Sequence, residues 1–182
     1  VRDGVLECVK AGPDRSIHIL TREVGPQRGE VAVALDLAGL SPGQDKTAEA
    51  WVGFRLASQG RFGDYRDDAV RGVGLSTGLR GDGRLFIEKD AGDTVPLADV
   101  RRLASELTPV EGGYRLTTRA FDASGRELGA ISGEVAAGRV ERGTLAIVCH
   151  QAVCGVRQWT AGGTKLDAHE DRAFGPILFT QY

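Results

Sequence analysis

The chain has 182 residues, of which 41% are hydrophobic and 26% are charged, with 23 Lys and Arg against 25 Asp and Glu. A formal net charge of −2 gives no electrostatic footprint for nucleic acid or for an anionic membrane. No apolar run approaches the roughly 18 residues that a membrane-spanning helix needs. We therefore expect one folded domain with no nucleic-acid partner and no membrane span. Because the chain contains no Met and begins at Val1, we also expect a processed piece of a longer protein.

Glycine is the outlier in the composition. The chain has 26 glycines, about twice the average usage of roughly 7%. They lie at short intervals between apolar runs, as turns between strands do, and they form no collagen-like period or linker-like block. This spacing favours an all-β protein.

The first half of the chain carries the clearest strand patterns. Large apolar residues alternate from Val31 to Leu37 and again from Ala50 to Leu56, which places each set on one face of a strand. The Asp-Gly pair within 80–83 predicts a hairpin turn. Shorter strands are expected at 5–9, 16–21, 70–75 and 85–88.

The second half continues the pattern, with one ambiguous segment. Residues 99–107 have leucines at helical spacing and at strand spacing, and periodicity alone does not decide between them. A Gly-Gly turn then leads into a strand over 114–121, which is followed by a polar turn at 122–126. Further strands are expected at 127–131 and 144–149, and the continuous apolar run of the latter is typical of a strand buried on both faces.

Three cysteines leave two arrangements open. Cys149 and Cys154 are separated by four residues, and if they flank a turn between two strands they can form a disulfide that leaves Cys8 buried. The alternative is three thiols in the core, since buried reduced cysteine is common. A zinc site is disfavoured because the spacing lacks a second pair of ligands.

The segment 59–68 is the most suggestive candidate for a binding site. Aromatic rings provide platforms for sugars, and clustered carboxylates provide the hard oxygen ligands that Ca²⁺ prefers. The competing interpretation is a solvated loop in which Arg61 and Arg66 neutralise the acids, and no EF-hand spacing is present. The candidate ligand-binding residues are Phe62, Asp64, Tyr65, Asp67 and Asp68.

No catalytic motif is present in the sequence. It lacks a nucleophile elbow, a phosphate-binding loop, a dinucleotide fingerprint and the paired histidines of a zinc protease. Glu88 and Glu134 stand singly near predicted strand ends, where exposed charge is expected. The histidines are isolated from one another, and His150, beside two cysteines, is the best candidate among them. We therefore assign no catalytic and no metal-ligating residue to this segment.

The second half of the chain resembles a known family. Residues 112–122, 125–128 and 144–150 resemble the closing strands of concanavalin A-like (laminin-G-like) jelly-roll domains. Residues 157–166, followed by 173–182, resemble the junction found in bacterial alkaline phosphatase D-like (PhoD-like) proteins, where such a sandwich precedes a calcineurin-type metallophosphoesterase domain. The resemblance covers about residues 100–182, and these motifs contain no catalytic residue. Relatives often carry a Phe-Asp-Asp-Trp-like run, whereas residues 156–159 here lack its carboxylates.

This resemblance implies a two-sheet antiparallel jelly-roll sandwich over residues 1–167 and a joining segment over 168–182. It further implies a non-catalytic accessory module linked to a downstream phosphatase domain, which would hold any divalent metals. Export to the periplasm, the cell surface or the medium is implied as well, and it would permit a disulfide. The alternative function is a carbohydrate-binding or Ca²⁺-binding lectin-like module.

Overall fold

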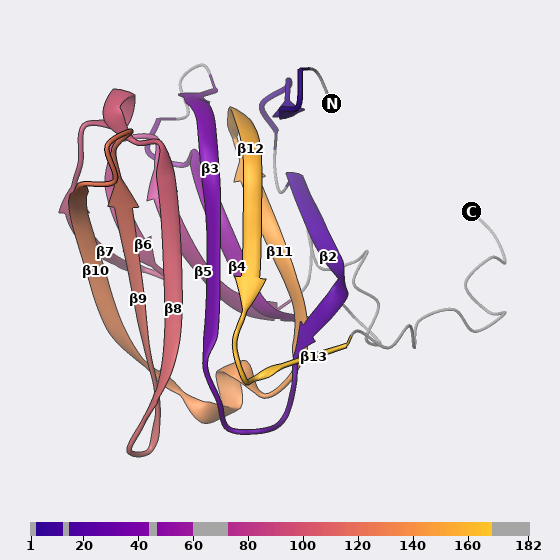
Figure 1. Ribbon diagram of the computed structural model, residues 1–182. Helices are drawn as coiled ribbons and strands as arrows, with labels where there is room; N and C mark the ends of the chain where they lie inside the picture. Colours follow the sequence, from indigo (N-terminus) through magenta and orange to yellow (C-terminus); the bar gives the residue numbers. More distant parts are fainter. Residues whose placement is uncertain (1–2, 13–14, 44–46, 60–72, 169–182) are drawn as a thin grey trace, which may run out of the picture.

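The computed structural model describes residues 3–12, 15–43, 47–59 and 73–168. Within these ranges the chain forms two antiparallel sheets that lie face to face (Figure 1). Helical structure in the described ranges is limited to two 3₁₀ turns, η3 (Leu97–Asp99) and η4 (Ala137–Val140). No helix among these residues has the length and hydropathy needed to cross a bilayer. The expected all-β, two-sheet antiparallel architecture is confirmed.

The strands of each sheet come from distant parts of the sequence. We call the first sheet the six-stranded sheet, after its described strands. Their spatial order is β1 (Leu6–Cys8), β12 (Ala152–Gly162), β3 (Val31–Pro42), β8 (Arg102–Val110), β9 (Gly113–Phe121) and β10 (Glu127–Ala136). Those of the second, the seven-stranded sheet, follow the order β13 (Leu166–Ala168), β2 (Arg15–Val24), β11 (Gly143–His150), β4 (Trp51–Gln59), β5 (Val73–Arg80), β6 (Arg84–Ile87) and β7 (Asp90–Thr94).

The core between the sheets is filled by the alternating residues that the sequence predicted. Every second residue from Val31 to Leu37 is at most 4% exposed, as is every second residue from Val52 to Leu56. The same alternation buries one face of β9 from Tyr114 to Ala120. Strand β11 is buried on both faces from Gly143 to Cys149, and it pairs with β2 on one edge and with β4 on the other. Its unbroken apolar run therefore marks a central strand.

The ambiguous segment 99–107 contributes to a strand and not to a long helix. Only η3 is helical, and β8 follows it directly. Strand β8 pairs with β3 on one edge and, through the predicted Gly-Gly turn, with β9 on the other. Pairing with a strand on each edge therefore settles the choice between helix and strand, which the periodicity of the sequence did not. No strand is predicted from the sequence at β7, β12 or β13; β7 and β13 are short and largely polar, and β12 mixes polar and apolar residues.

Three hydroxyl side chains connect the two sheets inside the core. Thr118 of β9 is 2.6 Å from the Thr77 hydroxyl of β5 and 2.8 Å from the Ser105 hydroxyl of β8. Thr77 donates its proton to the Phe86 carbonyl at 2.7 Å, so it must accept from Thr118, which in turn accepts from Ser105. Each of the three residues is at most 1% exposed. The chain of bonds therefore satisfies buried polar groups that would otherwise destabilise the sandwich.

The predicted turn at 122–126 is built around one carboxylate. Asp122 Oδ1 accepts hydrogen bonds from the Ser124 hydroxyl at 2.7 Å and from the Ser124 and Arg126 amides at 2.8 and 3.1 Å. Its Oδ2 accepts from Arg126 Nε at 3.1 Å. The Ser124 hydroxyl, together with the Arg126 side chain and the two amides, holds the pKa of Asp122 well below its usual range. Gly125, at φ 83°, supplies the left-handed residue that the turn requires.

Thr118→Val should lower the free energy of unfolding by about 1–3 kcal/mol, because it leaves Ser105 without an acceptor and Thr77 without a donor. The matched control is Thr117→Val on the opposite face of β9, where the hydroxyl bonds to the solvent-accessible Ser132. Urea unfolding of both variants measures the difference, and the control should change stability by no more than about 0.5 kcal/mol. Equal losses for the two variants would contradict the role of the buried chain.

Asp122→Asn should lower the melting temperature at neutral pH, because the folded state favours the ionised carboxylate. The lowered pKa means that this contribution is complete above the ordinary carboxyl pKa of about 3.9 and is lost as the pH falls further. Thermal unfolding of both proteins from pH 7 to pH 2 should therefore show a difference that narrows below about pH 4. A difference that stays constant across this range would show that the carboxylate does not stabilise the turn through its charge.

Candidate functional site

The outer face of the seven-stranded sheet carries three rows of residues that run across β11, β4 and β5. Residues two apart on a strand share a face, so the strand register defines the rows. The first row is His150, Trp51 and Arg80; the second is Val148, Gly53 and Gly78, with Phe86 of β6 beside it; the third is Ala146, Arg55 and Ser76.

The second row is held open by a pair of glycines. Gly53 and Gly78 face each other across β4 and β5. A Cβ atom on Gly53 would lie 2.1 Å from the Thr77 carbonyl oxygen, and one on Gly78 would lie 2.2 Å from the Val52 carbonyl oxygen. Both approaches involve backbone atoms that cannot move aside cheaply, so the two strands pack closely only with glycine at these positions. As a result, no side chain separates the first row from the third on β4 or β5.

The first row forms an aromatic cluster with Phe86. The Trp51 ring meets the Phe86 ring edge-on, with centroids 5.2 Å apart and an interplanar angle of 80°. On its other side Trp51 stacks with His150, with centroids 6.1 Å apart and an angle of 26°. The Arg80 guanidinium lies 5.1 Å from the Phe86 ring centroid. Phe86 is buried, whereas Trp51 and His150 are partly exposed, so the cluster presents two planar rings on a fixed base.

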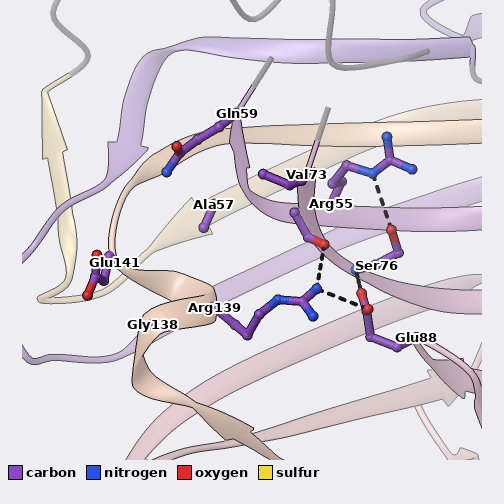
Figure 2. A pocket seen from close by; sticks show the side chains of 10 residues that line it. Arg55, Ala57, Gln59, Val73, Ser76, Glu88, Gly138, Arg139 and Glu141 are labelled. Carbon is purple, nitrogen blue, oxygen red and sulfur yellow. Dashed lines mark hydrogen bonds and ion pairs between the residues drawn. The ribbon is translucent and has the colours of Figure 1, made fainter. Parts of the chain in front are cut away.

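The third row continues into a polar network centred on Glu88. The two carboxylate oxygens of Glu88 accept from the Ser76 amide at 2.8 Å and from Arg139 Nη2 at 3.0 Å. Arg139, on η4, also donates to the Gly74 carbonyl at 3.1 Å, and Arg55 Nε donates to the Ser76 hydroxyl at 3.2 Å. Figure 2 shows Arg139 extending from η4 toward Glu88, which directly follows β6. Glu88 has a φ of 54° because it begins the two-residue turn between β6 and β7, where Ile87 pairs with Asp90.

Two hollows lie over these rows and join at the polar network. The larger has a volume of about 720 Å³ and extends toward η4, and the smaller, of about 340 Å³, extends toward Trp51 and His150. Arg55, Ser76 and Glu88 line both. Each volume is in the range of small-molecule sites, and together they form one groove with aromatic rings at one end and charged groups at the other.

The residues predicted to bind a ligand lie outside the described ranges. Phe62, Asp64, Tyr65, Asp67 and Asp68 all fall within 60–72, so their role stays a prediction. The described residues on either side of that segment, Gln59 and Val73, both line the larger hollow (Figure 2).

Sequence reasoning missed most of the groove. In the sequence Glu88 is an ordinary charge near a predicted strand end, and the strand pattern from Ala50 to Leu56 does not single out Trp51. His150 was the best of the histidine candidates, and it lies in the groove against Trp51. Strand register brings these residues together, and register cannot be predicted from the periodicity within a single strand.

No cluster that could hold a metal ion occurs among the described residues. Cys8, Cys149 and Cys154 are thiols in this structure, so the predicted pairing of Cys149 with Cys154 stays a prediction. The boundary between a sandwich over 1–167 and a joining segment over 168–182 also stays a prediction, because the description ends at residue 168.

Comparison with solved structures gives matches among legume lectins. Lectin I from Ulex europaeus, in complex with the methyl glycoside of α-L-fucose, superimposes with a TM-score of 0.57 at 13% identity, over 91% of this chain and 88% of that one. The seed lectin of Lotus tetragonolobus superimposes with a TM-score of 0.58 at 12% identity, over 93% and 90% of the two chains. At this identity the likeness shows the fold, and it confirms the concanavalin A-like jelly roll.

The sequence comparisons add no family. No family model and no curated protein matches the chain. Nothing in the comparisons links the chain to PhoD-like phosphatases, so that part of the resemblance is without support.

Gly53→Ala should destabilise the fold by about 1–3 kcal/mol, because its Cβ would overlap the backbone of β5. Gly39→Ala in β3 is the matched control, since a Cβ there has nothing within 4 Å and the change removes backbone freedom from the unfolded chain. Chemical unfolding should show a large loss for the first variant and no loss for the second. If Gly53→Ala were as stable as the parent, the glycine pair would not constrain the groove.

Proposed function

We propose that this chain is a carbohydrate-binding, lectin-like module and that the groove on the outer face of the seven-stranded sheet is its sugar site. The observation that carries the proposal is the partly exposed Trp51–His150 stack, which shares one groove with the Glu88–Arg139 pair.

The two ends of the groove match the two kinds of surface on a sugar. One face of a pyranose ring is a patch of C–H groups, which packs against a flat aromatic ring such as Trp51. The ring edges carry hydroxyl groups, which need fixed donors and acceptors. A groove with an aromatic wall at one end and charged planar groups at the other can satisfy both surfaces of one ligand.

The polar network has hydrogen-bonding capacity beyond its internal contacts. A carboxylate offers about four acceptor positions, and the described donors to Glu88 are the Ser76 amide and Arg139. A guanidinium offers five N–H donors, and the described acceptors of Arg139 are Glu88 and the Gly74 carbonyl. These contacts hold both side chains in place before a ligand arrives, which lowers the entropic cost of binding.

The legume lectins support this function over an accessory role in a phosphatase. Their fold matches along most of this chain, and one of them is described with a fucose glycoside. The linked phosphatase domain, its divalent metals and the export of the protein stay predictions from the sequence resemblance. The Ca²⁺ version of the lectin-like alternative depends on residues 64–68, which lie outside the described ranges.

Screening on a glycan array, followed by isothermal titration calorimetry with the best oligosaccharide, tests the proposal. Trp51→Ala should weaken binding at least about tenfold, equal to about 1.4 kcal/mol, because it removes the aromatic wall. The chain has one other tryptophan, Trp159, which is 41% exposed on β12 of the opposite sheet. Trp159→Ala is therefore a matched control and should bind as the parent does.

Two outcomes would contradict the proposal. An array with no bound glycan would remove the lectin-like function itself. Equal weakening by Trp51→Ala and Trp159→Ala, with both variants folded by circular dichroism, would move the site away from the groove.

A further inference from the structure

The three cysteines of the chain meet at one end of the sandwich. Cys8 of β1 and Cys154 of β12 are directly opposite each other in the antiparallel register. Cys149 comes from β11 of the other sheet, and its thiol donates to the Ala152 carbonyl at 3.3 Å. The Cys8 thiol lies 3.7 Å from the same carbonyl oxygen. The Ala152 carbonyl oxygen therefore lies within reach of thiols from both sheets.

We propose that Cys8 and Cys154 form a disulfide under oxidising conditions and that Cys149 stays a thiol. Directly opposed residues of antiparallel strands have Cα atoms about 4.5–5.5 Å apart, which lies within the 4.4–6.8 Å span of disulfides. The alternating burial of β1 turns Leu6 and Cys8 toward the core, and Cys154 of the neighbouring strand is likewise buried. The two sulfur atoms therefore start from the same face of paired strands.

Access to oxidant distinguishes Cys8 from the other two thiols. Cys8 is partly exposed, whereas Cys154 and Cys149 are 5% and 4% exposed and both belong to the hydrophobic core. Cys8 is therefore the first thiol to react, and the strand register places Cys154 directly opposite it. The hydrogen bond of Cys149 with Cys154, together with burial, raises the pKa of Cys149 well above its usual range, and a protonated thiol is a poor nucleophile.

The reaction needs a disulfide donor such as oxidised glutathione. The Cys8 thiolate attacks one glutathione sulfur, forms a mixed disulfide and releases one reduced glutathione. The Cys154 thiolate then attacks the Cys8 sulfur and expels the second glutathione as a thiolate. Two protein thiols lose two electrons and two protons, and one oxidised glutathione becomes two reduced molecules. The product ties the short strand β1 to β12 and closes a loop that spans most of the chain.

Tryptic mapping of the whole chain separates the possible pairs. Cleavage after Arg2, Lys10, Arg142 and Arg157 places Cys8 in peptide 3–10 and both other cysteines in peptide 143–157. After incubation with oxidised glutathione, acid quenching and alkylation, we expect peptide 3–10 linked to peptide 143–157. Fragmentation between His150 and Cys154 should place the bond at Cys154, with the Cys149 thiol alkylated. This assignment comes from the parent protein, so it does not depend on a variant that folds.

Two variants and one stability measurement complete the test. Cys149→Ser should keep the cross-link, and Cys154→Ser should lose it. Closure of so long a loop should raise the melting temperature of the oxidised protein by about 5–10 °C. A closed disulfide within peptide 143–157 would overturn the proposal in favour of the pair expected from sequence. No cross-link at any ratio of oxidised to reduced glutathione would overturn both.

Discussion

The hydrophobic interface between the two sheets determines where the other side chains of this protein can lie. Every central strand must place its large apolar residues in that interface, so the intervening residues are forced outward. On β4 this puts Phe54 inside and the pair Trp51 and Arg55 outside. The hydroxyl chain centred on Thr118 fits the same interface only because each of its donors finds an acceptor within it. The groove is therefore a consequence of the core, built from the residues that the core excludes.

The outer face becomes a groove because of the close contact between β4 and β5. The Gly53–Gly78 pair removes side chains from the middle row, so Trp51 can reach across β5 to Phe86. On the other side of this row, Glu88 and the network around it form the charged end. Flat rings and fixed charges thus lie close together on one sheet face, which is the arrangement that a ligand with both apolar and hydroxylated surfaces requires.

The sequence predicted the elements of this protein better than their contacts. Alternation identified the inner faces from Val31 to Leu37 and from Tyr114 to Ala120, since burial on one face leaves a period of two in the sequence. The turn around Asp122 could also be predicted, because its polar residues and its glycine are close together in the sequence. The groove could not be predicted, because Glu88 and Arg139 are 51 positions apart and meet only through packing of η4 against the sheet. The opposition of Cys8 and Cys154 depends on register in the same way.

The central claim is that a sugar binds on the seven-stranded sheet, and the two tryptophan side chains allow a direct test. Each indole N–H gives one resolved signal in a nitrogen-edited NMR spectrum, and Trp51 and Trp159 lie on opposite sheets. We predict that titration with the best oligosaccharide from the array shifts the Trp51 indole signal and leaves the Trp159 signal in place. A shift confined to Trp159, or saturable binding that moves neither signal, would contradict the account.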